Sequence, residues 1–223
     1  MCIRDSPSLV ESVLALGVEF NTLVIDDGSD PAIETDGMSG SRQRYFRCPS
    51  NVGLGVAMNI ALDYAHNEQF DIFLRIDADG QHSVECLLPI LEAMVSRGTD
   101  VMVGARSNNL SFDSSKSIIA SMLKRHMNAT ANWVSGLQLD EWHSGLIVLS
   151  RRAIEELHLL EYERYPEVEV LLRGVQLHLK IDQFPIIQNQ RVHGRSTITL
   201  IGGIHLTMRF YMLLLRHILE RRT

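Results

Sequence analysis

Strand-like and helix-like segments alternate along the chain, and this alternation limits the possible folds more than any other feature of the sequence. Short apolar runs typical of strands lie at 22–25, 42–47, 70–76, 100–104, 145–149 and 179–185. Apolar residues at helical spacing lie around them, at 7–16, 57–64, 83–97, 115–134, 151–157 and 167–174. Because this order is typical of proteins whose helices cover a parallel sheet, we expect an α/β fold with a mainly parallel sheet.

Composition favours one well-packed domain without affinity for nucleic acid. The chain has 223 residues, of which 45% are hydrophobic and 22% charged. A chain of this length buries about 70% of its unfolded surface in a single core. The 21 Lys and Arg residues against 27 Asp and Glu residues give a net charge of −6, so there is no overall basic field to hold nucleic acid.

Cysteine and histidine spacing argues against disulfide and zinc chemistry. The three cysteines are an odd number and form no CxxC pair, and the nine histidines form no HExxH motif. Any metal site must therefore use carboxylates. With no apolar signal segment at 1–6, we expect a cytoplasmic protein in a reducing compartment.

Two acidic clusters directly follow two of the expected strands. Asp26 and Asp27 follow the first strand, and the Asp77-Ala78-Asp79 triplet follows the third. Open α/β sheets bind their ligands at the carboxyl ends of parallel strands. In such a triplet one carboxylate can orient a nucleotide ribose while the other holds Mg²⁺ or Mn²⁺ with a diphosphate. Alone, an Asp-x-Asp triplet is more often a solvated turn.

The segments around the Asp77-Ala78-Asp79 triplet indicate which function it has. Six segments in this order resemble the ordered blocks of the family 2 glycosyltransferases of GT-A fold: Val24 to Ser29, Asn51 to Gly55, Asp77 to His82, Trp142 to Gly145, Tyr165 to Glu169 and Arg191 to Ser196. The form of the third block is most similar to the dolichol- and polyprenyl-phosphate sugar transferase branch and its bacterial relatives. The resemblance implies a GT-A-like, Rossmann-related three-layer domain that moves a sugar from a nucleotide-diphosphate sugar, with inversion, to a polyprenyl phosphate or a cell-surface glycan.

The resemblance also implies roles for individual residues on the donor side. Asp26 and Asp27 would contact the nucleoside, Asp77 would face the ribose or diphosphate, and Arg191 would neutralise the leaving diphosphate. Gly53 and Gly55 would let the chain turn beside the nucleoside. The divalent metal, Mg²⁺ or Mn²⁺, would be held by Asp79 and Gln81.

Glu167 and Glu169 are the candidate catalytic carboxylates that the fifth block supplies. In the wider family the catalytic acid aligns with Glu167, which would act as a base toward a hydroxyl acceptor. In the polyprenyl-phosphate branch the retained acid aligns with Glu169, and a phosphate acceptor needs no base. Residues two apart on a helix point about 200° apart, so one should face the cleft and the other should face outward or toward Arg173.

The two ends of the chain depart from this pattern or extend it. The family normally begins with a strand ending in a Pro-x-x-Asn-Glu block, which is absent at 1–6 although 7–16 matches the helix that should follow. We therefore expect an N-terminally truncated domain at 1–196, followed by an amphipathic helix at 197–223. On that helix Met208, Tyr211, Leu215 and Leu219 would form one apolar stripe.

The C-terminal helix has two interpretations. Arginines and histidines interrupt its apolar residues, so it suits the membrane interface better than a membrane span. We expect peripheral contact with the inner face of the cell membrane, or ordinary packing on the core.

Two other functions stay open from the sequence alone. A non-catalytic nucleotide-sugar-binding or scaffold protein would keep the same blocks. A phosphatase of the haloacid dehalogenase type also places Asp-x-Asp after a strand, but it needs Thr or Val soon after the second Asp, where this chain has Gly80 and Gln81.

Overall fold

The computed structural model describes residues 20–33, 42–78, 81–106, 118–159, 162, 166–187 and 200–220. Its strands are β1 (Thr22–Asp26), β2 (Gln43–Arg47), β3 (Ile72–Arg75), β4 (Val101–Arg106), β5 (Ile147–Ser150) and β6 (Ile181–Ile186). Its helices are α2 (Leu54–Asn67), α3 (Leu87–Arg97), α4 (Ile118–Ser135), α5 (Arg151–Leu157), α6 (Pro166–Gln176) and α7 (Leu200–Glu220), with a 3₁₀ turn, η1, at Val84–Cys86. The expected elements at 1–16 and the block at 191–196 lie outside these ranges.

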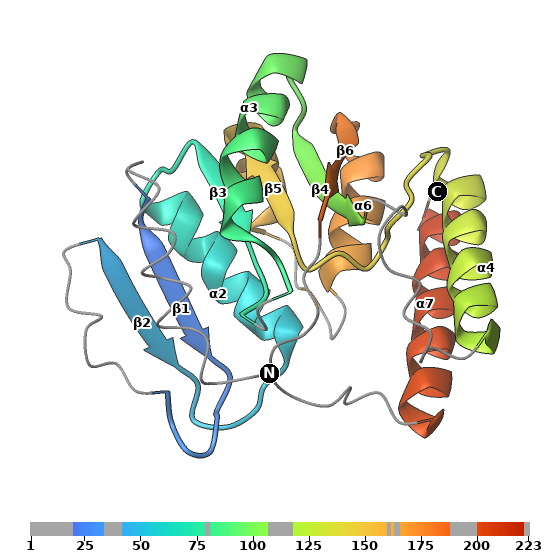
Figure 1. The fold of residues 1–223 in the computed structure, drawn as a ribbon, viewed down its shortest axis with the longest axis horizontal. Coiled ribbons are helices and arrows are strands. Elements are labelled where there is room, and N and C mark those ends of the chain that lie inside the picture. Colours follow the sequence, from blue (N-terminus) through green and yellow to red (C-terminus); the bar gives the residue numbers. More distant parts are fainter. Residues whose placement is uncertain are drawn as a thin grey trace.

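Within the described residues the strands form two sheets. β1 and β2 pair in parallel, and the larger sheet has the order β3-β5-β4-β6 (Figure 1). β4 and β6 are parallel, whereas β5 is antiparallel to both β3 and β4. β3, β4 and β6 therefore run in one direction, which confirms the expected mainly parallel α/β arrangement with β5 as its exception.

The larger sheet is buried on both faces, which gives the fold its three layers. On β4, Val101 and Val103 belong to the core beneath α2, α5 and α6, whereas Met102 belongs to the core beneath α3. On β5, Ile147 and Val148 divide in the same way between the two cores. Successive side chains of a strand point to opposite faces, so two neighbouring strands whose consecutive residues are buried and apolar must be covered by helices on both sides.

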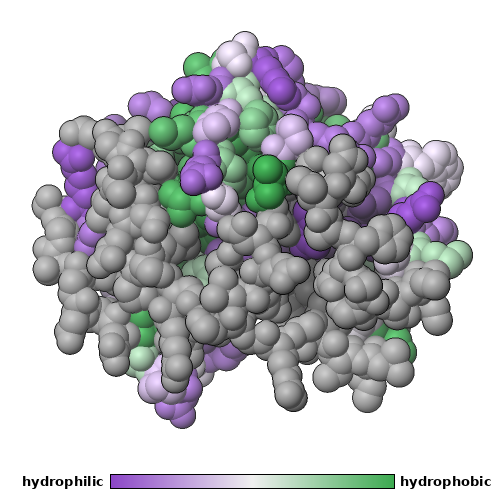
Figure 2. Space-filling model, in the orientation of Figure 1, coloured by the Kyte–Doolittle hydropathy of each residue, from purple (hydrophilic) through white to green (hydrophobic). Residues whose placement is uncertain are grey.

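Helix α3 covers its side of the sheet but presents some apolar surface outward. Its buried face is Leu87, Ile90 and Met94, and the left-handed Gly98 ends the helix. Val95, on the opposite face, is 68% exposed. In the space-filling view, hydrophobic residues gather over this part of the molecule between polar ones (Figure 2).

Helix α7 is fastened to the domain by both apolar and polar contacts. Phe210 and Leu214 are buried in the core, and α7 packs beside α4 and α6 (Figure 1). At its end, Glu220 accepts hydrogen bonds from Arg173 at 2.7 Å, Gln176 at 2.9 Å and Arg216 at 2.7 Å. None of the described helices combines the length and apolar character that crossing a bilayer requires.

The Glu220 cluster predicts a pH-dependent contribution to stability. Burial alone would raise the pKa of Glu220, but hydrogen bonds from Arg216 and Gln176 and the charge of Arg173 outweigh burial and lower this pKa from 4.5 to about 2. A carboxyl with a lowered folded-state pKa stabilises the fold above its unfolded pKa and loses that effect as pH falls through its folded pKa. Urea unfolding should therefore show Glu220→Gln less stable than the parent at pH 7, with the difference vanishing as pH falls from about 4.5 toward 2. A difference that is constant over this range would contradict the assignment.

Candidate functional site

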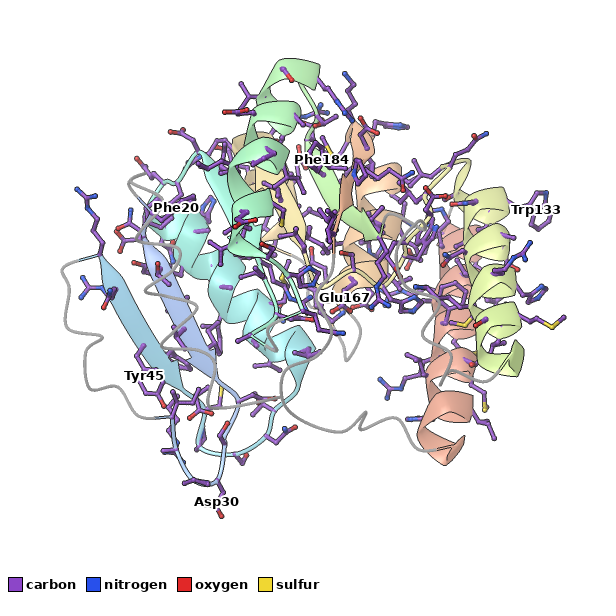
Figure 3. All side chains as sticks on the ribbon, in the orientation of Figure 1. Phe20, Asp30, Tyr45, Trp133, Glu167 and Phe184 are labelled. Carbon is purple, nitrogen blue, oxygen red and sulfur yellow. The ribbon has the colours of Figure 1, made fainter. Side chains whose placement is uncertain are left out.

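The centre of the candidate site is an ion-paired cluster at the carboxyl end of β3. Nη2 of Arg75, the last residue of β3, lies 3.0 Å from Oδ1 of Asp77 and 2.6 Å from Oε1 of Glu167. The side chains of Arg75 and Glu167 are 13% and 10% exposed. Glu167, near the start of α6, lies at the centre of the molecule in Figure 3. The structure thus brings together two of the residues singled out from the sequence, Asp77 and Glu167, through one that was not.

The charges in this cluster are strongly coupled. Burial by itself would lower the pKa of Arg75, but the carboxylates of Glu167 and Asp77 outweigh burial and raise this pKa above its ordinary value. Arg75 is therefore a permanent cation between two carboxylates. The three side chains together carry one net negative charge, which suits a site that receives a cation.

Gly145 explains why the Trp142-to-Gly145 block belongs to this site. A Cβ atom built on Gly145 would lie 2.1 Å from Oδ2 of Asp77 and 2.5 Å from its Cγ. The carboxylate of Asp77 therefore packs directly on the backbone of residue 145. The segment is fixed by Ser144, whose Oγ donates to the carbonyl oxygen of Gly104 at 2.6 Å.

His143 lies between two groups of charged residues. Burial lowers its pKa, although the nearby carboxylates of Glu167 and Glu141 act in the opposite direction. Oε2 of the buried Glu141 lies 2.6 Å from Nζ of Lys124 and 3.9 Å from Nε of Arg106. Lys124 and Arg106 could not be assigned to the site from the sequence, because nothing in their spacing predicts that α4 and β4 meet at Glu141.

The first acidic cluster links two of the sequence blocks. Asp27 accepts hydrogen bonds from the backbone N–H groups of Val52 at 2.6 Å and Gly53 at 3.0 Å, at the start of α2. Gly28 makes this approach possible: its φ is +69°, and a Cβ there would lie 2.3 Å from the carbonyl carbon of Ser50. Gly53 also has a positive φ, of 94°, and precedes α2.

Asp26 is more deeply placed than Asp27. It is fully buried, and its carboxylate accepts hydrogen bonds from the Ser29 N–H and the Tyr45 hydroxyl, each at 2.8 Å. Burial alone would raise its pKa, but the hydrogen bonds from Ser29 and Tyr45 outweigh burial and lower it. In this structure Asp26 stabilises the turn after β1. Its contact with a nucleoside stays a prediction.

Glu169 does not join the central cluster. Although it is only two residues from Glu167, it lines a small cavity between α6 and α7 with Arg173, Arg216 and His217. On this side of α6, burial and then the charge of Glu169 raise the pKa of Tyr162. The two glutamates face different surroundings, as expected from their spacing on a helix.

The other residues singled out from the sequence are only partly covered. Gly55 is buried in the first turn of α2, and Gln81 lies in the described segment after β3. Asp79 and Arg191 lie outside the described residues. Within the described ranges, His, Cys, Asp and Glu side chains form no group of three or more that could bind a metal ion.

Comparison with known proteins identifies the family. The sequence model described as Glycosyl transferase family 2 matches residues 7–138, more than half of the chain. The chain belongs to glycosyl transferase family 2. It is therefore a transferase, and the phosphatase that the Asp-x-Asp triplet left open is not supported.

Two curated relatives act on lipid phosphates according to their names. The chain is 23% identical over 204 residues to polyprenol monophosphomannose synthase of Mycolicibacterium smegmatis, covering 88% of this chain and 77% of that protein. It is 22% identical over 156 residues to UDP-N-acetylglucosamine–dolichyl-phosphate N-acetylglucosaminyltransferase of Methanococcus voltae, covering 68% of this chain and 62% of that protein.

A solved structure confirms the GT-A-like fold. Glucosyl-3-phosphoglycerate synthase of Mycobacterium tuberculosis, solved with Mn²⁺, UDP-glucose and phosphoglyceric acid, superimposes with a TM-score of 0.69 at 18% identity. The match covers 96% of this chain and 75% of that chain.

The contact between Gly145 and Asp77 gives a test of the site. The side chain of Gly145→Ala would enter the space of the Asp77 carboxylate, which must then turn away. If Asp77 contacts the donor, affinity for Mn²⁺ with UDP-glucose or GDP-mannose, measured by calorimetry, should fall at least tenfold, about 1.4 kcal/mol. Val95→Ala on α3 is the control, since Val95 is 68% exposed and lies outside the site. Equal affinity in both variants would remove Asp77 from the donor site.

Proposed function

We propose that this family 2 glycosyltransferase moves a sugar, with inversion, from a nucleotide-diphosphate sugar to a polyprenyl phosphate. The observation that carries the proposal is the Arg75-centred cluster, which joins Asp77 of the donor motif to Glu167 of the acidic helix. A cell-surface glycan hydroxyl is the second acceptor class, and it places a different demand on Glu167.

The charge distribution favours a phosphate acceptor. Oε1 of Glu167 already lies 2.6 Å from Nη2 of Arg75, so this oxygen is occupied by a cation rather than directed at the hydroxyl of an acceptor. A phosphate oxygen is ionised when it arrives and needs no base. Lys124 and Arg106, gathered at Glu141 beside His143, offer positive charge to such an acceptor. The names of the two curated relatives agree with this acceptor class.

On the donor side, we propose that the chain orients the nucleotide through residues at the ends of β1 and β3. Asp27 and Asp26, with Gly53 and Gly55, would shape the nucleoside pocket. Asp77, fixed between Arg75 and Gly145, would meet the ribose or diphosphate. Arg191 would stabilise the negative charge of the departing diphosphate, because a guanidinium suits two neighbouring phosphate oxygens.

A divalent cation fits the oxygen donors after β3. We propose that Asp79 and Gln81 would hold Mg²⁺ or Mn²⁺, because hard cations prefer carboxylate and amide oxygens. The net negative charge of the neighbouring Arg75 cluster is compatible with a bound cation. When bound, the ion would stabilise negative charge on the diphosphate.

Glutamine variants of the two glutamates separate the acceptor classes. With polyprenyl phosphate as acceptor, we expect Glu167→Gln to keep turnover within about tenfold, because no proton has to be removed, and Glu169→Gln to lower it more. Turnover would be followed as nucleotide-diphosphate release from UDP-glucose, UDP-N-acetylglucosamine and GDP-mannose with Mn²⁺. Urea unfolding of each variant controls for loss of fold.

Other results would change the assignment. A fall of about 10² in Glu167→Gln with donor affinity kept would indicate a hydroxyl acceptor and make Glu167 its base. Donor binding without turnover on any acceptor would favour the non-catalytic binding or scaffold protein.

We further propose peripheral contact with the inner face of the cell membrane through α7. Five exposed apolar residues form one stripe along this helix: Ile204, Met208, Met212, Leu215 and Leu219. The stripe predicted from the sequence was wrong at Tyr211, which is half-buried with its ring 5.4 Å from Phe210. Arg209 and Arg216 lie on the same helix, where they suit anionic headgroups.

Flotation with liposomes containing anionic lipid tests this contact. Met208 and Met212 are 63% and 64% exposed, so replacing both with Gln should leave the core intact and reduce the bound fraction several-fold. Val95→Gln on α3, where Val95 is 68% exposed, is the matched control. Equal flotation of both variants at low salt would refute the membrane proposal.

A further inference from the structure

Arg75 contacts the carboxylates of Asp77 and Glu167, and none of the six sequence blocks assigns Arg75 a role. It lies two residues before Asp77, on the same face of the chain, at the end of β3. A single nitrogen, Nη2, lies within 3.0 Å of both Asp77 and Glu167, so the two carboxylates share one cation. Because these carboxylates come from elements about 90 residues apart, this contact is the direct link between the donor motif and α6.

The carboxylate of Asp77 is fixed from two sides. Its Oδ1 accepts a hydrogen bond from Arg75 at 3.0 Å, and its Oδ2 packs on the backbone of Gly145. Gly145 limits where the carboxylate can go, but it supplies no attraction. Arg75 supplies the attraction, and Glu167 holds Arg75 in place at 2.6 Å. Without Arg75, Asp77 would lose its only described side-chain partner.

Stability of the fold does not account for this arrangement. Nη1 of Arg75 is buried and has no hydrogen-bond partner among the described residues. A buried donor without a partner is unfavourable, and apolar side chains of similar size often replace buried ion pairs without loss of stability. Proteins accept one or two such violations at functional sites, and this one lies between two carboxylates of the candidate site.

We propose that Arg75 is a positioning residue that orients the Asp77 carboxylate toward the donor nucleotide, with Glu167 as its anchor. The inference rests on the proposed function, because it assumes that Asp77 meets the donor. Arg75 itself acts through Asp77. The residue is therefore required for donor affinity even where the charge of Glu167 has been removed.

A comparison in the Glu167→Gln background separates positioning from a merely structural role. If Arg75 only neutralises Glu167, replacing it after Glu167 has become Gln should leave donor affinity unchanged. If Arg75 positions Asp77, the double variant Arg75→Met/Glu167→Gln should bind Mn²⁺ with UDP-glucose or GDP-mannose at least tenfold more weakly than Glu167→Gln alone. Removing both buried charges together leaves no uncompensated charge in the core, so this variant should fold, as urea unfolding would verify.

Four results decide the outcome. Arg75→Lys/Glu167→Gln should recover part of the lost affinity, because lysine keeps the charge but not the forked geometry. Arg97→Met is the matched control: Arg97 pairs with Asp182 at 2.8 Å outside the site, so its loss should leave affinity unchanged. Equal affinity of Glu167→Gln and the Arg75→Met/Glu167→Gln variant overturns the positioning role. Failure of the parent protein to bind either nucleotide sugar overturns the proposed function instead.

Discussion

Burial of the larger sheet on both faces is the constraint on which the rest of the structure depends. β4 and β5 contribute side chains to the cores on opposite faces, so helices must cover both sides. That covering leaves the strand ends as the places where polar side chains can gather. The Asp77 carboxylate, the Gly145 backbone and the start of α6 meet at one such end. The position of the site is thus a consequence of how the core is divided between the two faces.

The chemistry of the site depends on how its charges are paired. Arg75 and Glu167 are nearly removed from solvent, where an ion pair is strong and its loss would be costly. Near them lie His143, whose pKa burial lowers, and the buried Glu141, which forms an ion pair with Lys124. Glu167 and Glu141 therefore each have a positive partner, and the half-exposed Asp77 is the group of the cluster that a ligand can most easily reach.

Sequence reasoning found most of the described strands and helices because these depend on local pattern, whereas the candidate site residues came from the resemblance of six blocks to a family. The strand ends at Asp26 and Asp77 and the helix carrying Glu167 follow from apolar runs and their spacing. It did not find that β5 runs antiparallel, because an apolar run carries no sign of its direction. The role of Arg75 was also missed, because its contact with Glu167 on α6 is long-range and the sequence around Arg75 does not show it. The burial of Tyr211 was missed for the same reason, because helical periodicity does not show which face meets α4.

The bond between Asp27 and the start of α2 has a consequence for how the diphosphate is received. In many nucleotide-binding folds, the N–H groups at the start of a helix receive the phosphate. Here the N–H groups of Val52 and Gly53 already hold the protein's own carboxylate. The negative charge of Asp27 therefore already compensates the positive end of the α2 dipole. A nucleoside that bound beside Asp27 would meet a loop that needs no further ordering. In the proposed donor site the phosphates would therefore be neutralised elsewhere, and the base and the phosphates would be recognised by separate parts of the fold.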